Sequence, residues 1–199
     1  MPQPVIYYVR HGLTDWNAGG RLQGQHDTAL NAEGRAQAAY CGDLLCDLFA
    51  RAGRAPQSFA YVSSPLVRAT ETMNIVRASL GLDPDGYRVE PRLAEISFGD
   101  WEGLTYDEVL ACEPEVVARR ERDKWGFLLP GGESYVQVAA RVGAWYATIE
   151  RDTVVTAHGG TGRALIALLG IAAPETAVHH SIDQGVVYVF ADRQLMRYS

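Results

Sequence analysis

Three apolar runs, each followed by a helical pattern, constrain the fold of this 199-residue chain most strongly. The runs occupy residues 5–9, 59–62 and 153–157. Near-continuous apolar runs of this length are typical of strands that are buried on both faces of a sheet. Strands that alternate with helices are joined by crossover connections, which make neighbouring strands parallel. The pattern therefore predicts a mainly parallel sheet covered by helices.

Capping signals predict where the helices begin. Asn31 is expected to cap the helix that follows the first strand. Ser64 is expected to cap the helix after the second strand, with Pro65 in its first turn. Ser134 and Gln137 form a capping box that opens a helix leading into the third strand. These signals therefore place one helix after the first strand, one after the second strand and one directly before the third strand.

Two apolar segments near the end of the chain, residues 185–190 and 194–199, predict further strands joined by a short turn through Asp192. A short turn joins antiparallel strands, so the sheet is expected to be mixed. The predicted fold class is α/β: a three-layer α/β/α sandwich in which helices cover both faces of a mostly parallel mixed sheet. We expect residues 1–199 to form a single domain, because the length is typical of one.

Composition excludes several classes of function. The net charge of −6 argues against nucleic acid as a partner, because polyanion binding relies on a basic surface. No apolar stretch approaches the ~20 residues that cross a bilayer, and the first residues lack the pattern of a secretion signal. We therefore expect no membrane partner and a cytoplasmic location. The three cysteines show no metal-like spacing and suit reduced thiols.

Arginine and histidine residues follow all three apolar runs. Arg10 and His11 follow the first, Arg68 lies shortly after the second, and His158 with Gly159 follows the third. The carboxyl ends of parallel strands meet at one edge, where such sheets bind ligands, so these residues are expected to form one site. Two arginines favour a phosphate or carboxylate ligand. No metal, nucleotide or dinucleotide motif is present in the sequence.

A histidine next to a phosphoryl group can act as a covalent nucleophile when it is neutral. Arg10 and Arg68 are expected to lower the pKa of His11 and to hold the phosphate oxygens. Gly12 is expected to let the backbone approach the phosphate closely. The leaving oxygen needs a proton donor, and a carboxylic acid with a raised pKa suits that role. We assign it to Glu95, which has more apolar neighbours than the other acidic residues near it.

Five segments occur in an order typical of one known family: RHGLTDWNAGGRLQG, SSPLVRATET, EISFGDWEG, PGGES and HGGTGRALIALLG. With them the chain resembles the histidine phosphatase superfamily, the phosphoglycerate mutase-like proteins. The resemblance implies that His11 is phosphorylated, that Glu95 is the general acid, and that no metal or organic cofactor is needed. It implies a short lid at residues 103–131. The other implied site residues are Arg10, Arg68 and His158 around the phosphate, and Asn17, Gln23, Gly24 and Gly159 along the substrate.

The resemblance implies a metal-independent phosphatase that hydrolyses small phosphomonoesters. Residues 101–131 form a shorter segment than the basic insertion of the family's mutases, so water is the expected phosphoryl acceptor. The alternatives are a cofactor-dependent phosphoglycerate mutase, or a non-catalytic member that binds a phosphorylated ligand or a partner protein. Sugar phosphates, α-ribazole phosphate, phosphoglycerate and phosphoproteins all remain possible substrates. A homodimer through apolar lid residues is also compatible with the sequence.

Other polar residues are given structural roles. Arg163, in the helix after His158, is expected to be a structural ion-pair partner and not a ligand. His26 is expected to face solvent, and His179 and His180 are expected to be structural.

Overall fold

A six-stranded mixed sheet forms the centre of the protein, which we describe for residues 3–199 of a computed structural model. The strand order is β3-β2-β4-β1-β5-β6. The first four strands in this order are parallel to one another, and β5 and β6 are antiparallel additions at one side. The strands are β1 (Ile6–Arg10), β2 (Ala60–Ser63), β3 (Arg88–Val89), β4 (Thr153–Ala157), β5 (Val187–Ala191) and β6 (Gln194–Tyr198).

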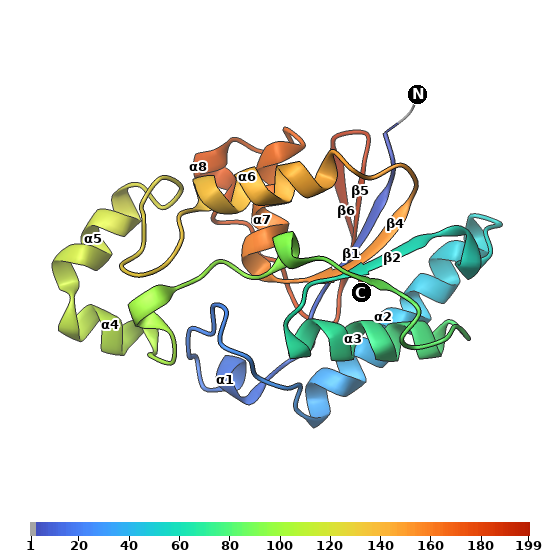
Figure 1. The fold of residues 1–199 in the computed structure, drawn as a ribbon, viewed down its shortest axis with the longest axis horizontal. Helices are drawn as coiled ribbons and strands as arrows, with labels where there is room; N and C mark the ends of the chain where they lie inside the picture. The colour runs from blue at the N-terminus through green and yellow to red at the C-terminus, as the bar shows by residue number, and fades with distance from the viewer. Residues whose placement is uncertain (1–2) are drawn as a thin grey trace.

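Helices cover both faces of this sheet (Figure 1). On one face lie α2 (Ala32–Arg51) and α3 (Val67–Ser79), which pack against each other. On the other face lie α6 (Tyr135–Tyr146), α7 (Gly159–Leu168) and α8 (Pro174–Ala177). The α/β/α sandwich with a mixed sheet, predicted from the alternation of strands and helices, is confirmed.

The remaining helices lie in the connections. They are α1 (Asp15–Ala18), α4 (Tyr106–Cys112) and α5 (Pro114–Arg122), with short 3₁₀ helices at Pro56–Ser58, Pro91–Leu93 and Gly99–Trp101. Figure 1 shows α4 and α5 standing to one side of the sandwich, at the end where α1 also lies. No helix in the described part of the chain is long and apolar enough to cross a membrane.

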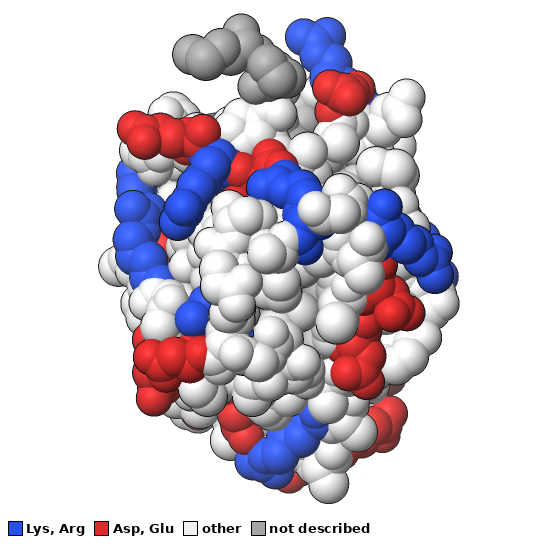
Figure 2. Space-filling view, turned by 90° about the vertical axis from the view of Figure 1, so that its right-hand side faces the viewer, with Lys and Arg blue, Asp and Glu red and all other residues white. Residues whose placement is uncertain are grey.

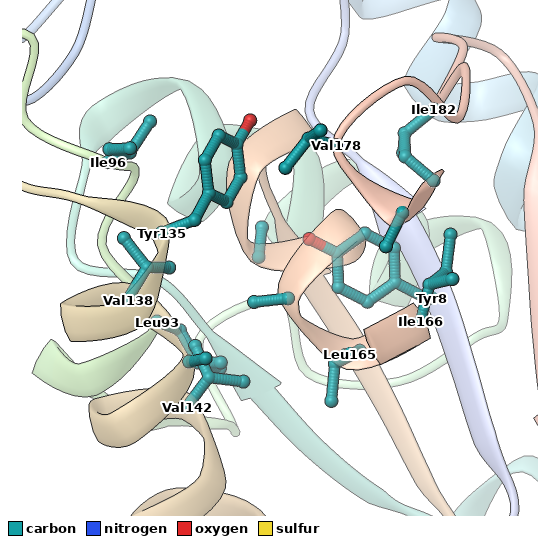
Figure 3. Packing of buried hydrophobic residues seen from close by; sticks show 14 of the residues in the cluster. Tyr8, Leu93, Ile96, Tyr135, Val138, Val142, Leu165, Ile166, Val178 and Ile182 are labelled. Carbon is teal, nitrogen blue, oxygen red and sulfur yellow. The ribbon is translucent and has the colours of Figure 1, made fainter. Parts of the chain in front are cut away.

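Each face of the sheet has its own apolar core. The core beneath α2 and α3 includes Val9, Leu45 and Met73, all fully buried. The core on the opposite face is larger, and Figure 3 shows Tyr8 of β1 among residues of α7 and the segment after α8. Because successive strand residues point to opposite faces, adjacent residues such as Tyr8 and Val9 enter different cores. This explains why β1 is apolar throughout.

The helix boundaries agree with the sequence signals except at α3. Asn31 caps α2 through a bond from the Gly34 N–H, and Ser134 opens α6 with the predicted capping box. The expectation that Ser64 caps α3 with Pro65 in its first turn is wrong, since that helix begins at Val67, beyond both residues, and its N-cap residue Leu66 forms no side-chain cap. The Ser64 N–H still bonds to the Thr156 carbonyl of the neighbouring chain segment. Ser64 therefore belongs to the end of the strand pairing, and its hydroxyl has a different partner, described below.

The turn between β5 and β6 uses two left-handed residues, Asp192 at φ 48° and Arg193 at φ 59°. Two successive residues with positive φ are the mark of a type I′ hairpin, whose twist matches that of the strands. The predicted turn through Asp192 is confirmed.

Candidate active site

The carboxyl ends of β1 and β4 bring two histidines together. Arg10 pairs with Ala157 in the parallel register of these strands, so the next residues, His11 and His158, are neighbours across the sheet. The His11 N–H continues the pairing by donating to the Ala157 carbonyl at 2.9 Å. The two imidazole ring centres lie 5.1 Å apart. Residues separated by nearly 150 positions in the chain thus share one site because their strands are parallel neighbours.

The hydrogen bonding of His11 determines which ring nitrogen carries its proton. Nδ1 lies 2.8 Å from the Gly12 carbonyl oxygen, which can only accept, so Nδ1 carries the proton. Nε2 is then the unprotonated nitrogen of the neutral ring, with Nε of Arg68 at 3.3 Å. A lone pair on Nε2 is what a nucleophilic histidine needs.

Burial and positive charge both keep His11 neutral. The ring is only 2 % exposed. Its pKa is lowered well below the ordinary value, first because burial disfavours the charged form and then because Arg68 and Arg10 repel an imidazolium. The predicted direction of this shift is confirmed, and burial rather than arginine is its largest cause.

Arg68, in the first turn of α3, is held by main-chain carbonyls. It is 1 % exposed, and its two terminal nitrogens donate to the carbonyls of His26 at 2.9 Å and Gly24 at 2.7 Å. No carboxylate within the described residues forms an ion pair with it. Arg68 therefore brings a positive charge to the site that carbonyl dipoles hold in place without neutralising it.

Arg10 adds a second cation from the end of β1. One terminal nitrogen donates to the Ile182 carbonyl at 2.8 Å, and Nε is buried without any hydrogen-bond partner. Buried donors are rarely left unpaired, so this N–H is available to an incoming acceptor. An oxyanion between Arg10 and Arg68 would supply that acceptor.

His158 lies behind His11 and does not contribute to the wall of the cavity described below. Its Nε2 lies 2.6 Å from the hydroxyl of Ser64, which also accepts a bond from the Leu66 N–H at 3.4 Å. The pKa of His158 is also well below the ordinary value, because of burial and then the charge of Arg68. Its Nδ1 is buried without a partner.

Glu95 approaches the site from the loop that follows the 3₁₀ helix Pro91–Leu93. Oε1 accepts hydrogen bonds from the N–H groups of Ile96 and Gly160, each at 2.9 Å, and Oε2 lies 3.2 Å from the Gly160 nitrogen. The Gly160 N–H belongs to the first turn of α7, where backbone amides are free to bind an anion. These bonds hold the carboxyl group at the edge of the cavity.

A cavity of about 160 Å³ joins these groups. Eight of the nine residues assigned from the sequence line it, His158 being the exception, and they are Arg10, His11, Asn17, Gln23, Gly24, Arg68, Glu95 and Gly159. Four further lining residues were not assigned as ligands from the sequence: Arg21, Leu22, Phe98 and Arg163. Leu22 and Phe98 lie inside two of the quoted segments, but their apolar side chains carry no chemical signal.

Arg163 corrects one expectation. It forms no ion pair within residues 3–199. Instead it donates to the His180 carbonyl at 2.9 Å and the Tyr135 hydroxyl at 3.3 Å, and it lines the cavity. The amphipathic pattern of α7 could not show that its one charged residue points at the site.

Gly12 is required by the packing of the backbone. A Cβ on Gly12 would lie 2.1 Å from the Gly34 carbonyl oxygen, so its absence allows α2 to pack directly against the loop after β1. The expected close approach of this backbone to the phosphate stays a prediction. The three other histidines do not line the cavity. His26 is exposed and stacked on Trp16, and His179 and His180 follow α8.

No group of three or more histidine, cysteine, aspartate or glutamate side chains suited to a metal ion occurs within residues 3–199. The polar groups that converge on the cavity are mainly donors and cations. The site is therefore built for an anion.

Comparison with known proteins identifies the family. Residues 6–193 match the histidine phosphatase superfamily (branch 1). The chain is 38 % identical over 178 residues to glucosyl-3-phosphoglycerate phosphatase of Mycobacterium tuberculosis (strain CDC 1551 / Oshkosh), covering 82 % of this chain and 74 % of the relative. It is 30 % identical over 193 residues to the 2,3-bisphosphoglycerate-dependent phosphoglycerate mutase of Beijerinckia indica subsp. indica, covering 94 % and 90 %.

A solved structure leads to the same family. The native structure of a mycobacterial glucosyl-3-phosphoglycerate phosphatase superimposes with a TM-score of 0.78 at 32 % identity, covering 94 % of this chain and 89 % of the other. The family match spans nearly the whole chain, and these relatives share both its sequence and its fold. This chain therefore belongs to branch 1 of the histidine phosphatase superfamily.

Proposed function

We propose that this protein is a metal-independent phosphatase that hydrolyses small phosphomonoesters through a phosphohistidine on His11. The observation that carries the proposal is the neutral, buried His11, whose Nε2 lies 3.3 Å from Nε of Arg68 in a cavity that Arg10 also lines; neither arginine has a carboxylate partner within residues 3–199. Such a ring is a nucleophile at neutral pH, and the arginines supply the charge that a phosphoryl group needs. The phosphatase relative at 38 % identity supports the same reaction class.

In the first step, Arg10 and Arg68 hold the phosphate oxygens while Nε2 of His11 attacks phosphorus. The bond from phosphorus to the ester oxygen breaks, and Glu95 gives its proton to that oxygen as the alcohol leaves. The Gly12 carbonyl accepts the Nδ1–H of His11 and stabilises the positive charge that forms on the ring. The products of this step are the free alcohol, phosphohistidine and the Glu95 carboxylate.

In the second step, water attacks the phosphohistidine. Glu95 takes a proton from the water, and the bond between phosphorus and Nε2 breaks. Inorganic phosphate leaves, and both His11 and Glu95 return to their starting protonation states. The reaction consumes one water for each ester and needs no group outside the chain.

The roles of the outer residues are part of the proposal. Asn17 accepts a hydrogen bond from Gln184 through Oδ1, and its amide nitrogen is left for the substrate. The proposed lid, residues 103–131, includes α4 and α5, and Arg21 bonds to it through the Gly103 carbonyl at 2.7 Å. We propose a small phosphorylated metabolite as substrate, a single domain over residues 1–199, a cytoplasmic location and, through the apolar lid residues, a homodimer.

The test is phosphate release from a panel of phosphomonoesters with a chelator present. Wild type is compared with His11→Ala and with His179→Ala, a matched control in an exposed histidine outside the site. Release that resists the chelator, disappears in His11→Ala and persists in His179→Ala is the expected result. Quenching in alkaline detergent, in which the P–N bond of phosphohistidine is stable, with a substrate radiolabelled in its phosphate should trap label on wild type and not on His11→Ala. Wild-type turnover without any trapped label, or turnover by His11→Ala, would contradict the proposal.

A second candidate function is phosphoglycerate mutase, which the relative at 30 % identity favours. Both reactions begin with phosphohistidine, but they differ in the acceptor of the phosphoryl group. Incubation with 3-phosphoglycerate and 2,3-bisphosphoglycerate distinguishes them, because a mutase forms 2-phosphoglycerate and a phosphatase releases phosphate.

A further inference from the structure

A second cavity, larger than that of the active site, lies at the opposite end of the sheet. It has a volume of about 780 Å³ and opens beside the amino-terminal halves of β2 and β4. It arises because β2 has four residues while β3 pairs only with Val62 and Ser63. Ala60 and Tyr61 are left without a strand on that side. The space is bordered by the segments that follow α3 and α6 and not by another strand.

A buried arginine without an acidic partner lies in the wall of this cavity. Arg77, near the end of α3, is 6 % exposed. Its Nε donates to the Asp83 carbonyl at 2.7 Å, and its guanidinium lies 4.5 Å from the centre of the Tyr61 ring. Within residues 3–199 no carboxylate oxygen lies within ion-pair distance of Arg77. A buried cation of this kind normally has a counter-ion.

The guanidinium packs against the backbone of Gly86. A Cβ on Gly86 would lie 2.6 Å from Nη2 of Arg77, so a larger residue there would displace the end of the arginine side chain. The same Cβ position lies 3.4 Å from Oδ2 of Asp83, so the Asp83 carboxylate is near the guanidinium but beyond ion-pair distance, and it accepts a bond from the Asp85 N–H. The two terminal nitrogens of Arg77 form no hydrogen bond within residues 3–199, and the residue lines the cavity.

The other charges around the cavity are more exposed. Arg88 is paired with Glu90, whose carboxylate also binds Arg92. Arg151 and Glu150 are exposed at the rim. Figure 2 looks onto this side of the molecule and shows uncharged residues in its middle with basic side chains above them. Arg77 is thus the one buried, unpaired charge among the described residues that line this cavity.

The uncharged part of the wall is largely apolar or aromatic, with Gln57, Thr148 and Thr153 as its polar side chains. It includes Tyr61, Leu82, Tyr87, Trp145 and Ile149. The pKa of Tyr61 is raised to about 12 by burial, so its phenol stays protonated and adds no negative charge. A concave site that combines apolar walls with one convergent charge is the usual form of a small-molecule site.

We propose that this cavity binds a small organic anion, with a carboxylate or phosphate on Arg77 and a flat apolar body against Tyr87 and Ile149. The planar guanidinium presents two terminal nitrogens, which match the oxygens of either anion. The single unpaired arginine calls for one anionic group and not for a polyanion. This inference is independent of the proposed phosphatase reaction, since the two sites share no residue.

The test is binding of the fluorescent anion 1-anilinonaphthalene-8-sulfonate to the whole protein, followed by competition. The competitors are benzoate, which supplies a carboxylate, and phenylphosphonate, a phosphate analogue without an ester bond for the enzyme to hydrolyse. Benzyl alcohol is the uncharged control. We expect saturable binding that benzoate or phenylphosphonate displaces and benzyl alcohol does not. The better competitor identifies the anion that the site prefers.

Three variants locate the binding. Arg77→Met should weaken binding by about 10-fold to 100-fold, the usual contribution of a charged hydrogen bond. Ile149→Glu keeps Arg77 but places a negative charge in the wall, so it should weaken anion binding by a similar factor. This variant tests the proposal if Arg77→Met does not fold. Arg10→Gln, in the active site, should leave binding unchanged. Equal affinity in wild type and folded Ile149→Glu or Arg77→Met, or loss of binding in Arg10→Gln, would overturn the proposal.

Discussion

The carboxyl group of Glu95 rests on the backbone of Gly160. The Gly160 N–H donates to Oε1 at 2.9 Å, and a Cβ on Gly160 would lie 2.3 Å from the same oxygen. The same Cβ would also lie 2.9 Å from a methyl carbon of Ile96. The proposed proton donor is therefore positioned by the absence of a side chain at the start of α7.

Gly160→Ala should inactivate the enzyme although alanine favours helices over glycine. The added methyl would displace Glu95, so kcat/KM should fall by about 10²-fold to 10⁴-fold, as for loss of a general acid. Gly143→Ala in α6 is the matched control, because its added methyl meets only the flexible end of Leu168 at 3.3 Å. Circular dichroism should show both variants folded. Normal turnover by Gly160→Ala would mean that Glu95 need not occupy this position.

The stability of the protein should fall as pH drops below about 6.5, the ordinary pKa of histidine. His11 and His158 both have pKa values lowered well below that value in the folded state. Between the folded and unfolded pKa values the unfolded chain binds more protons, so the free energy of unfolding rises with pH and falls as pH decreases. Each histidine should contribute about 1.4 kcal/mol per pH unit in this window.

Urea unfolding between pH 7 and pH 5.5 measures this dependence. His11→Asn should show a slope smaller by the contribution of one histidine, while His179→Asn, at an exposed position, should keep the wild-type slope. A wild-type slope in His11→Asn would show that His11 is not held neutral by the folded protein.

Arg163 should select substrates that carry a second negative charge. It lines the cavity, and within residues 3–199 it has no acidic partner. Arg163→Met should lower kcat/KM for 3-phosphoglycerate by about tenfold or more relative to phenyl phosphate. The reason is that the carboxylate of 3-phosphoglycerate would lose its partner in the cavity, whereas phenyl phosphate has no second anionic group. Arg163→Lys should retain part of the preference. An equal fall for both esters would assign Arg163 to folding or to the phosphate itself.

Tyr8 connects the apolar core to the active site. Its hydroxyl lies 2.5 Å from the His158 carbonyl and accepts a bond from the His158 N–H at 3.0 Å. Tyr8→Phe removes these bonds, while the Thr161 hydroxyl still bonds to the N–H and the carbonyl of His158. It should therefore lower the free energy of unfolding by about 0.5–1.5 kcal/mol, the usual net contribution of a hydrogen bond. Tyr40→Phe is the control, because Tyr40 is 46 % exposed. Urea unfolding of both variants measures the difference, and equal stabilities would show that the hydroxyl contributes nothing net.

Local signals in the sequence were sufficient for the elements of the fold. The apolar runs mark β1, β2 and β4 to within one residue, and the polar residues after them mark the carboxyl edge of the sheet. The capping assignment failed at Ser64 because the helix begins later, at Val67, whose N–H donates to the Asp27 carboxylate at 2.7 Å. That partner comes from a distant loop, which local capping preference cannot show.

The active-site groups with an obvious chemistry were also predictable. Arg10, His11 and Arg68 were assigned from residue type and position, and the structure places them around one cavity. For Arg163 the sequence predicts an ion pair, and the structure shows instead that this residue lines the cavity. Helix periodicity cannot show which helix positions contact a loop from elsewhere in the chain. The Arg77 cavity left no signal in the sequence at all, since it depends on β3 being shorter than β2.

The sequence by itself determined the α/β class, the family and the identity of the reactive groups, because periodicity, turn chemistry and residue type are carried by neighbouring positions. Only the tertiary structure decided which arginines remain unpaired, which nitrogen of His11 carries the proton and where the Glu95 carboxyl group lies. These properties depend on burial and on contacts between residues far apart in the chain, such as Glu95 with Gly160. A charge acquires its chemical role from the groups that packing places, or fails to place, beside it.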